Sequence, residues 1–382
     1  DLKLYGGDGN DNITGGDGDD LLKGENGRDV LVGFRGNDTM LGGNGRDTMI
    51  WNNGDGSDIM NGGKGRDTVQ VNGSDGAGDV FEISADGENV HFARTNFGNF
   101  TLDISNSEVM IVRGLGGDDV ITAGEGLQGL IDLRLFGGAG NDQITGGDCN
   151  DQLIGGAGRD ILVGANGADT MKGGNGRDTM IWNNGDGSDV MDGGKGDDTV
   201  IVNGSDNAGD VFNIRGDGRD IDFNRSNFGP FTLDISKTEN MEVNGGGGDD
   251  VITADENLWS KVTLHLNGGE GDDKITGGNT NDVLDGGTGD DLLDGGSGND
   301  VLTGGEGADV FVFVAGQDVI TDFEHGQDIL IFDGKFEIGA EDVEDLLSQV
   351  GDDVVLTLGE DTMTFIGQTL DQFSLDDFGF LS

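Results

Sequence analysis

Aspartate recurs in this chain at a fixed spacing inside a glycine-rich frame. The nine-residue pattern G-G-x-G-x-D-x-U-x, in which U is a large apolar residue, occurs nineteen times in three arrays. Every copy has aspartate at its sixth position, from Asp11 to Asp309, and an apolar residue at its eighth. Ionised carboxylates only accept hydrogen bonds and are hard oxygen ligands. A periodic row of them therefore favours binding of hard cations.

The spacing also predicts the elements that position these carboxylates. Array one has seven copies, which begin at Gly6, Gly15, Gly24, Gly33, Gly42, Asn53 and Gly62; array two repeats this from Gly137 to Ile201, and array three has five copies between Gly268 and Val312. Six residues form a tight turn, because glycine tolerates positive φ and close backbone approach. The remaining x-U-x forms a short strand whose middle side chain points to one face. In array one the thin core would consist of Ile13, Leu22, Leu31, Met40, Met49, Met60 and Val69.

Stacked turns would bring the aspartates close together. If two copies make one coil, repeats i and i+2 lie about 4.8 Å apart, which gives thirteen neighbouring Asp pairs. Each bare pair costs about 1 kcal/mol in water and about 4 kcal/mol at an effective dielectric constant of ~20. Their total rivals the roughly 5 to 15 kcal/mol by which a domain is stable. We therefore expect the arrays to unfold without cations.

A dication between neighbouring turns reverses the sign of this interaction. Ca²⁺ accepts six to eight carboxylate and carbonyl oxygens in flexible geometry, whereas Mg²⁺ demands a tighter octahedron and keeps its waters. Calcium is the better fit, at about one ion per pair of stacked turns.

These nonapeptides resemble the RTX (repeats-in-toxin) repeats of bacterial proteins exported by type I secretion. The resemblance implies an all-β fold of right-handed parallel β-roll, or β-solenoid, arrays. It implies that glycine carbonyls and sixth-position carboxylates of adjacent turns bind Ca²⁺. It also implies export of the unfolded chain from a calcium-poor cytoplasm, with folding outside the cell.

The expected metal ligands are the sixth-position aspartates and glycines at the second and fourth positions. The aspartates are Asp11, Asp20, Asp29, Asp38, Asp47, Asp58, Asp67, Asp142, Asp151, Asp160, Asp169, Asp178, Asp189, Asp198, Asp273, Asp282, Asp291, Asp300 and Asp309, with Asp119 and Asp250 from two orphan repeats at Gly114 and Gly245. The glycines are Gly7, Gly9, Gly16, Gly18, Gly138, Gly140, Gly156, Gly158, Gly269, Gly271, Gly287 and Gly289.

Some turns depart from the pattern. Cys149 and Thr280 replace the fourth glycine, so we expect their turns to bind calcium less well. Phe34 and Ala165 replace the second glycine. Asn53 and Asn184 replace the first, just after an inserted Trp-Asn pair that breaks the 18-residue coil.

The chain repeats itself on a longer scale. The stretch GGNGRDTMIWNNGDGSD at Gly42–Asp58 returns unchanged at Gly173–Asp189, and this 131-residue spacing holds from Gly6 to Asn267. The opening DLKLYGG aligns with DLRLFGG at Asp132, so we expect the chain to start inside a module and to continue a longer protein.

The tandem modules predict six segments. They are array one (1–71), a strand and hairpin connector (72–136), array two (137–202), a second connector (203–267), array three (268–313) and a C-terminal segment (314–382). The resemblance to RTX proteins implies that this last segment is a cap with a type I secretion signal. Each connector is expected to form an antiparallel hairpin, with Asp86 and Gly87 in the first turn. Phe81, Ile83, Val90 and Phe92 would face one side, as would Phe212, Ile214, Ile221 and Phe223. The last segment contains the helical pattern VEDLLSQV and a hairpin around Gly359.

Composition limits the partners. There are 78 glycines and one proline, and 75 acidic against 21 basic residues give a net charge of −54. This charge argues against nucleic acid or an anionic membrane as a partner. A single cysteine excludes an intrachain disulfide framework, and no apolar run is long enough for a transmembrane segment. An N-terminal signal peptide is absent from this sequence.

Other signals have ordinary interpretations. Trp51 and Trp182 could stack on a sugar, but plugging the irregular coil is the favoured interpretation. His91, His265 and His325 share no module position and match no zinc or catalytic motif. GEGLQG at Gly124 is a chance match to a dinucleotide motif, and no nucleophile elbow occurs. Cys149 could cross-link two chains, yet a tolerated small residue in a turn is favoured.

The leading hypothesis is a non-enzymatic extracellular protein, a calcium-rigidified rod of tandem modules at the bacterial cell surface or in its matrix. Similar RTX proteins include adhesin stalks and surface layers, and assembly into a homo-oligomer, lattice or filament would suit identical modules. The alternative is a calcium-folded export tail of an exoenzyme or toxin whose catalytic domain lies upstream. Glycan binding through calcium bridges is a third hypothesis.

Overall fold

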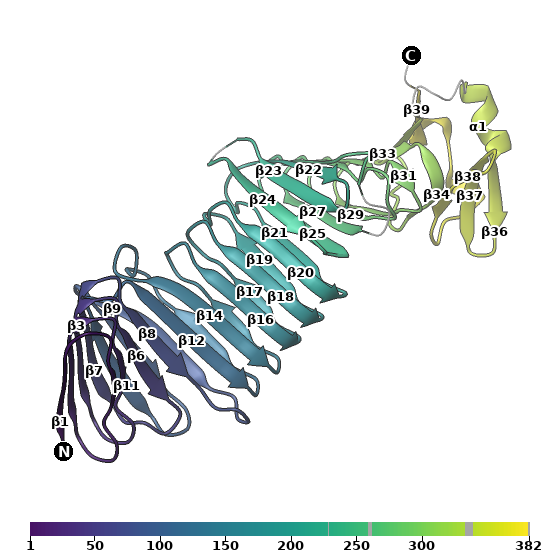
Figure 1. Cartoon of the computed structure of the whole chain (residues 1–382). Coiled ribbons are helices and arrows are strands. Elements are labelled where there is room, and N and C mark those ends of the chain that lie inside the picture. The colour runs from purple at the N-terminus through teal and green to yellow at the C-terminus, as the bar shows by residue number, and fades with distance from the viewer. Residues whose placement is uncertain (228, 259–261, 333–338, 381–382) are drawn as a thin grey trace. The chain divides into compact units, whose positions relative to one another are not determined.

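The computed structural model describes residues 1–227, 229–258, 262–332 and 339–380. The fold is all-β, as the sequence predicts, and its parallel strands stack into a β-solenoid (Figure 1). The chain divides into two compact units. Unit 1 comprises Asp1–Ile181 and Gly185–Asp198, and unit 2 comprises Trp182–Asn184 and the chain from Thr199 onward.

Unit 1 consists of short strands joined by tight turns. They are β1 (Lys3–Asp8), β2 (Asn12–Thr14), β3 (Leu21–Gly27), β4 (Val30–Val32), β5 (Thr39–Gly45), β6 (Thr48–Asn52), β7 (Asp58–Gly65), β8 (Thr68–Asn72), β9 (Val80–Asp86), β10 (Asn89–Arg94), β11 (Phe100–Ser105), β12 (Val109–Gly116), β13 (Val120–Ala123), β14 (Asp132–Ala139), β15 (Gln143–Thr145), β16 (Gln152–Gly158), β17 (Ile161–Val163), β18 (Thr170–Gly176), β19 (Thr179–Asn183), which belongs to this unit as far as Ile181, and β20 (Val190–Gly196).

Alternate strands of unit 1 lie in two sheets. The first sheet has the order β1-β3-β5-β7-β11-β10-β9-β13-β15-β17-β19, and the second has β2-β4-β6-β8-β12-β14-β16-β18-β20. Leu21 pairs with Thr39, 18 residues on, so two nonapeptides make one coil. At the inserted Trp-Asn pair the register becomes 20, as in Thr48 with Thr68.

The connector of unit 1 forms a three-stranded antiparallel meander inside the first sheet. Strand β11 pairs in parallel with β7 of the preceding coil, and β9 pairs in parallel with β13 of the following one. Strand β10 lies antiparallel between them. The sequence predicted the hairpin, with its turn beside Gly87, whose φ is +65°. The meander therefore continues the solenoid wall.

The core of unit 1 is the line of apolar side chains at the eighth repeat position. Leu22, Met40 and Met60 face inward from the first sheet, and Leu31, Met49 and Val69 from the second; all six are fully buried. At the meander the core widens into an aromatic cluster of Trp51, Phe81, Phe92 and Phe100.

Unit 2 repeats this architecture. Its strands are β21 (Thr199–Asn203), β22 (Val211–Asp217), β23 (Asp220–Arg225), β24 (Phe231–Ser236), β25 (Asn240–Gly247), β26 (Val251–Ala254), β27 (Thr263–Glu270), β28 (Lys274–Thr276), β29 (Val283–Thr288), β30 (Leu292–Asp294), β31 (Ser297–Gly298), β32 (Val301–Glu306), β33 (Val310–Phe313), β34 (Ala315–Ile320), β35 (Ile329–Phe332), β36 (Leu347–Val350), β37 (Asp353–Leu358), β38 (Asp361–Phe365) and β39 (Phe378–Phe380). Strands β22, β23 and β24 form the second meander.

The solenoid of unit 2 extends past array three. Strand β34 pairs in parallel with β32, and β35 pairs in parallel with β33. Strand β38 then pairs in parallel with β34, and β39 with β35. The helix α1 (Ala340–Leu346), the hairpin β37–β38 and the short 3₁₀ helices η1 (Leu370–Gln372) and η2 (Leu375–Asp377) follow.

The helical pattern VEDLLSQV is helical only in its first half. Leu347–Val350 forms strand β36, because these residues pair antiparallel with β37. No helix in the described part of the chain is long and apolar enough to span a membrane.

Candidate metal centres in the turns

The turn aspartates form ladders along the solenoid. Asp29 accepts the backbone N–H of Asp11 through Oδ1 at 2.8 Å, and Asp47 accepts that of Asp29 at 2.9 Å. Equivalent bonds join sixth-position aspartates of successive coils in both units, all between 2.7 and 2.9 Å. We call these rows the aspartate ladders. Each N–H offsets part of the repulsion between neighbouring carboxylates.

The second carboxylate oxygen is the distinctive feature of the ladders. It is buried and has no hydrogen-bond partner in Asp11, Asp20, Asp29, Asp38, Asp47, Asp58, Asp67, Asp119, Asp142, Asp151, Asp160, Asp169, Asp178, Asp189, Asp250, Asp273, Asp282, Asp291, Asp300 and Asp309. A buried acceptor without a donor is costly, and an ionised one more so. The turns thus contain a row of oxygens that require a cation or a proton.

Where a repeat begins with glycine, as at Gly24 and Gly42, that residue lies directly beside this oxygen. A Cβ on Gly24 would lie 2.4 Å from Asp29 Oδ2 and 2.5 Å from the carbonyl oxygen of Gly42 in the next coil. A Cβ on Gly42 would lie 2.7 Å from Asp47 Oδ2 and 2.6 Å from the Gly62 oxygen. Carboxylate and carbonyl oxygens from two coils therefore converge at one glycine.

At the second and fourth positions glycine is favoured for a different reason, because it tolerates positive φ. The twelve glycines expected as ligands all have positive φ, between +98° and +141°. Phe34 and Ala165 adopt the same left-handed region with φ of +66° and +62°, and so does Glu25 with +75°. The turn shape is therefore kept where the second glycine is replaced.

Burial raises the pKa of many ladder carboxyls, and the neighbouring aspartates add to the effect. The pKa is raised to about 8 for Asp58, Asp169 and Asp300, and to about 7 for Asp119, Asp151, Asp160, Asp250 and Asp291. Burial is the largest cause in each case, and the backbone N–H bond works against it. Without a bound cation, the fold therefore disfavours the charged form of these groups.

The oxygen set fits a hard dication held largely by the backbone. The described residues contain no group of three or more His, Cys, Asp and Glu side chains that could hold a metal. Each turn contributes one ladder carboxylate, and a carbonyl oxygen of the next coil lies close to it, as at Gly42 and Gly62, so backbone carbonyls can complete a ligand set. Carboxylates combined with carbonyls match the preference of Ca²⁺.

Comparison with known proteins supports this chemistry. A family model described as the RTX calcium-binding nonapeptide repeat matches residues 3–31, 14–49, 53–75, 111–126, 134–162, 154–181, 183–208, 242–257, 265–293 and 285–320. These matches together cover more than half of the chain. The chain belongs to the RTX calcium-binding repeat family.

Other comparisons add less about the RTX chain. None of the curated proteins compared with it matches. Among solved structures it is similar to the extracellular lipase LipA from Serratia marcescens, with 20% identity and a TM-score of 0.21. That match covers 72% of this chain and 45% of the lipase chain, so the RTX chain spans less than half of the lipase's length.

In unit 1 the meander places an internal cation beside one ladder carboxylate. Asp79 occupies a ladder position, since its N–H donates to Asp119 Oδ1. Its own Oδ1 accepts from Arg94 at 3.0 Å and its Oδ2 from the Ser74 N–H at 2.7 Å. Both oxygens of this buried carboxylate therefore have donors.

The Arg94 guanidinium is fixed from several sides. It also donates to Asn53 Oδ1 at 2.8 Å and to the Gly98 carbonyl at 3.1 Å, and it lies within 5.5 Å of the ring centroids of Trp51 and Phe100. The tryptophan of the inserted pair and the asparagine that replaces the first glycine thus build the arginine site.

Unit 2 contains the same arrangement. Arg225 donates to Asp210 at 3.2 Å and to Asn184 at 2.8 Å, and it lies against Trp182 and Phe231. Sequence reasoning missed Asp79, Asp210 and both arginines. The strings GDVF at Gly78 and Gly209, which keep only the D-x-U part of the repeat, were the available signal.

The ladders also continue past the predicted repeats. Asp318 accepts the Asp300 N–H at 3.0 Å, and Asp328 accepts the Asp309 N–H at 3.0 Å. The strings GQDVI and GQDIL, from Gly316 and Gly326, resemble the second half of a repeat and could have revealed both. In unit 1 Glu108 takes the acceptor role for the Asp67 N–H.

The two turns without a fourth glycine differ from the others. Thr280 donates its hydroxyl to Asp282 Oδ1 at 2.5 Å, which supplies a local donor to that carboxylate. Cys149 is buried and donates to the Ile131 carbonyl at 3.4 Å, and burial raises the pKa of its thiol to about 12. Neither position has positive φ.

The remaining signals follow their ordinary interpretations. Trp51 and Trp182 are fully buried and stack on Phe100 and Phe231, so neither ring is open to a sugar. His91 lies at the surface beside Asp103. The segment after Gly124 leads into β14 and forms no helix.

Proposed function

We propose that this chain binds Ca²⁺ between successive turns and serves as a calcium-rigidified scaffold of a secreted bacterial protein. The unpartnered Oδ2 atoms of the aspartate ladders carry this proposal. In each turn the ion would be held by sixth-position carboxylates together with carbonyls of the second- and fourth-position glycines. When bound, Ca²⁺ supplies the positive charge that these buried carboxylates need.

The proposal extends to the number of ions and to the way the protein is exported. One ion per pair of stacked turns neutralises two ladder carboxylates. The same repulsion would keep the chain unfolded in a calcium-poor cytoplasm, as type I export requires. We propose that residues 314–382 carry the export signal and that the folded protein remains outside the cell, at its surface or in its matrix.

A structural role rather than catalysis is the proposed activity of these residues. The buried acidic groups of the repeats are committed to the ladders, and the histidines lie at unrelated places. The export-tail alternative makes the same calcium prediction. The two hypotheses differ in self-association, which a scaffold needs and a tail does not.

Circular dichroism with sedimentation velocity during a calcium titration tests the proposal. Calcium should convert an expanded chain into a compact β structure, and magnesium at the same concentrations should not. A chain that is compact and rich in β structure in chelator would overturn it. Calcium-dependent assembly would favour the scaffold, and a calcium-folded monomer would favour the tail.

A further inference from the structure

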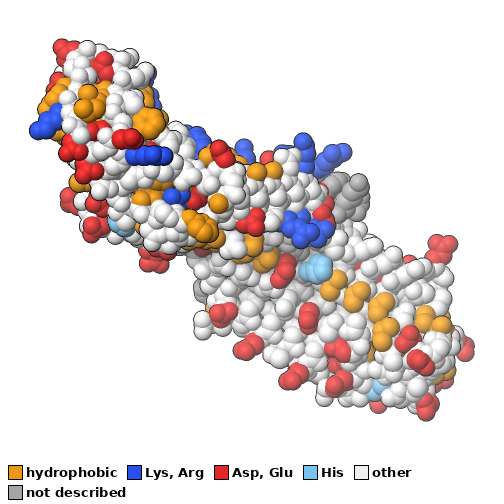
Figure 2. Space-filling view, turned by 90° about the horizontal axis from the view of Figure 1, so that it is seen from below, with side chains coloured by type: hydrophobic (Ala, Val, Ile, Leu, Met, Phe, Trp, Pro, Cys, Tyr) orange, Lys and Arg blue, Asp and Glu red, His pale blue; other side chains and the backbone are white. Residues whose placement is uncertain are grey.

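The fifth repeat position, which precedes each ladder aspartate, has opposite charges in the two units. In array one three successive coils have Arg28, Arg46 and Arg66 there, which we call the arginine row. In unit 2 the fifth positions of three successive coils are Asp249, in the orphan repeat, and Asp272 and Asp290, in array three. We call these three residues the acidic row. All six side chains are exposed. On the face drawn in Figure 2, Lys and Arg side chains also occur in clusters on a surface that is otherwise rich in acids.

The arginine row has a regular spacing. The strands that follow it pair in register, Val30 with Thr48 and Thr48 with Thr68, so the arginines project from adjacent coils about 4.8 Å apart. A groove of about 320 Å³ is lined by all three arginines, and one of about 470 Å³ by Arg46, Arg66 and Arg134. Within the described chain, Arg28 and Arg46 form no ion pair.

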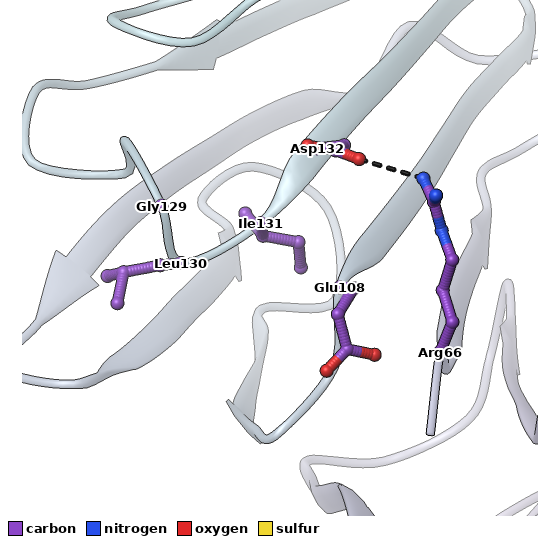
Figure 3. A pocket seen from close by; sticks show the side chains of 6 residues that line it. All are labelled: Arg66, Glu108, Gly129, Leu130, Ile131 and Asp132. Atoms are coloured by element: carbon purple, nitrogen blue, oxygen red, sulfur yellow. Dashed lines mark hydrogen bonds and ion pairs between the residues drawn. The ribbon is translucent and has the colours of Figure 1, made fainter. Parts of the chain in front are cut away.

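Arg66, the last residue of the arginine row, forms only an exposed ion pair. Arg66 points to Asp132 at 2.9 Å across a hollow of about 310 Å³, which Glu108 also lines (Figure 3). Both side chains of this pair are more than half exposed. An exposed pair of this kind is weak and exchanges readily for another partner.

The acidic row has the same spacing and a fixed orientation. Asp249 Oδ1 accepts the Asp272 N–H at 3.1 Å, and Asp272 Oδ1 accepts the Asp290 N–H at 3.0 Å. Asp290 Oδ1 accepts the Ala308 N–H at 2.9 Å. These bonds use one oxygen of each carboxylate and leave the other for an external donor.

We propose that the arginine row of one molecule binds the acidic row of a second copy of this chain. Both rows repeat once per coil, so three arginine–carboxylate pairs form together in one register. The contact joins two unlike surfaces and therefore extends into an open chain or closes into a ring. This inference rests on the proposed function, because both rows exist only when the arrays are folded.

The fifth-position residues of array two do not compete with the arginine row for the acidic row. The equivalent positions there are Arg159, Arg177 and Asp197, and Arg177 pairs with Asp197 at 3.1 Å within the same row. That row is partly self-neutralised and has little charge to offer. The matched pair of rows is therefore specific to arrays one and three.

Charge reversal tests the contact in the full chain with calcium at low ionic strength. One variant carries Arg28→Glu, Arg46→Glu and Arg66→Glu; the other carries Asp249→Arg, Asp272→Arg and Asp290→Arg. Sedimentation velocity should show that the wild type assembles, that each variant alone remains monomeric, and that an equimolar mixture of the two assembles again. A control with Arg159→Glu and Arg177→Glu should assemble like the wild type.

Several results would overturn this inference without touching the calcium proposal. If circular dichroism shows calcium-dependent folding but the wild type is monomeric, or if the mixture of variants fails to assemble, the row contact is wrong. Binding of polygalacturonate to the wild-type monomer, lost in the arginine-row variant, would assign that row to an acidic polysaccharide instead. If calcium induces no folding, the proposed function itself fails.

Discussion

At the scale of single residues, the two oxygens of most ladder aspartates in the arrays have different roles. One oxygen joins consecutive coils through a backbone N–H, and the other is buried and unpartnered. The first bond holds the carboxylate in place whether or not a cation is present. The second oxygen makes the fold depend on a cation or a proton.

Replacing a ladder aspartate by asparagine should weaken calcium-induced folding. Asp160→Asn keeps the size and the acceptor for the Asp142 N–H but removes the charge that attracts the ion. We expect the calcium concentration at the midpoint of folding to rise by roughly tenfold, which corresponds to about 1.4 kcal/mol. Circular dichroism during a calcium titration measures this. Asp217→Asn, at an exposed hairpin turn, is the matched control, and an equal shift in both variants would contradict the prediction.

The raised pKa values predict opposite effects of acid with and without calcium. The folded-state pKa of about 7 for Asp119, Asp160 and Asp250 exceeds the unfolded value near 3.9. The calcium-free fold then binds more protons than the unfolded chain, so its stability rises as pH falls from about 8 towards 4. With calcium present, protons compete for the same oxygens and the folding midpoint moves to higher calcium. Circular dichroism at several pH values, in chelator and in calcium, checks both signs, and the same sign in both series would refute this account.

At the scale of elements, each meander supplies an arginine to a buried ladder carboxylate. The Arg94–Asp79 pair lies among the meander aromatics, where burying an unpaired charge would be costly. The meander is thus the element of unit 1 whose ladder carboxylate is neutralised by the chain itself.

Removing that arginine should destabilise the meander even in saturating calcium. Arg94→Met leaves the Asp79 carboxylate buried without its cation, and we expect a loss of about 3 to 5 kcal/mol in the free energy of unfolding of this region. Urea unfolding in calcium, followed by hydrogen exchange of peptides from β9–β11, measures it. Arg159→Met, at an exposed site of the same unit, is the control. A loss that disappears when calcium is raised would instead mean that the metal can replace the guanidinium.

The sequence predicted the repeats well and the meander only in part. Glycine at the first position and aspartate at the sixth interact within one turn and with the next coil, so periodicity reveals them. Arg94 reaches Asn53 and Asp79, 41 and 15 residues away, and no periodic signal links these three. The pairing of β11 with β7 depends on chain reversal within the sheet, which alternation of side chains cannot specify.

At the scale of the whole molecule, the chain alternates arrays that contain unpartnered ladder carboxylates with meanders that have cores and cations of their own. The arrays bury a narrow line of eighth-position side chains, whereas Trp51, Phe81, Phe92 and Phe100 pack together in the first meander. Stability without calcium should therefore be concentrated at two places along the sequence.

Hydrogen exchange in chelator should show two protected segments. We expect slow exchange in β9–β11 and in β22–β24, and fast exchange in the turns of all three arrays. Adding calcium should extend the protection into the arrays, while magnesium should not. Mass spectrometry of peptides from both states gives the map. Uniformly fast exchange in chelator would mean that the arginine sites do not hold the meanders together.

Because one nonapeptide makes half a coil, the number of nonapeptides in an array decides in which of the two sheets the next strand lies. Successive nonapeptides of an array alternate between the two sheets, and the meander of unit 1 lies in the sheet that contains β1. Deleting one nonapeptide would move every downstream strand from its present sheet to the other one. Each outward side chain of those strands would then lie on the opposite side of the solenoid. Deleting two would restore the original wall and shorten the array by one coil. Gains and losses of nine residues therefore reorganise the surface of this protein, whereas gains and losses of eighteen change only its length.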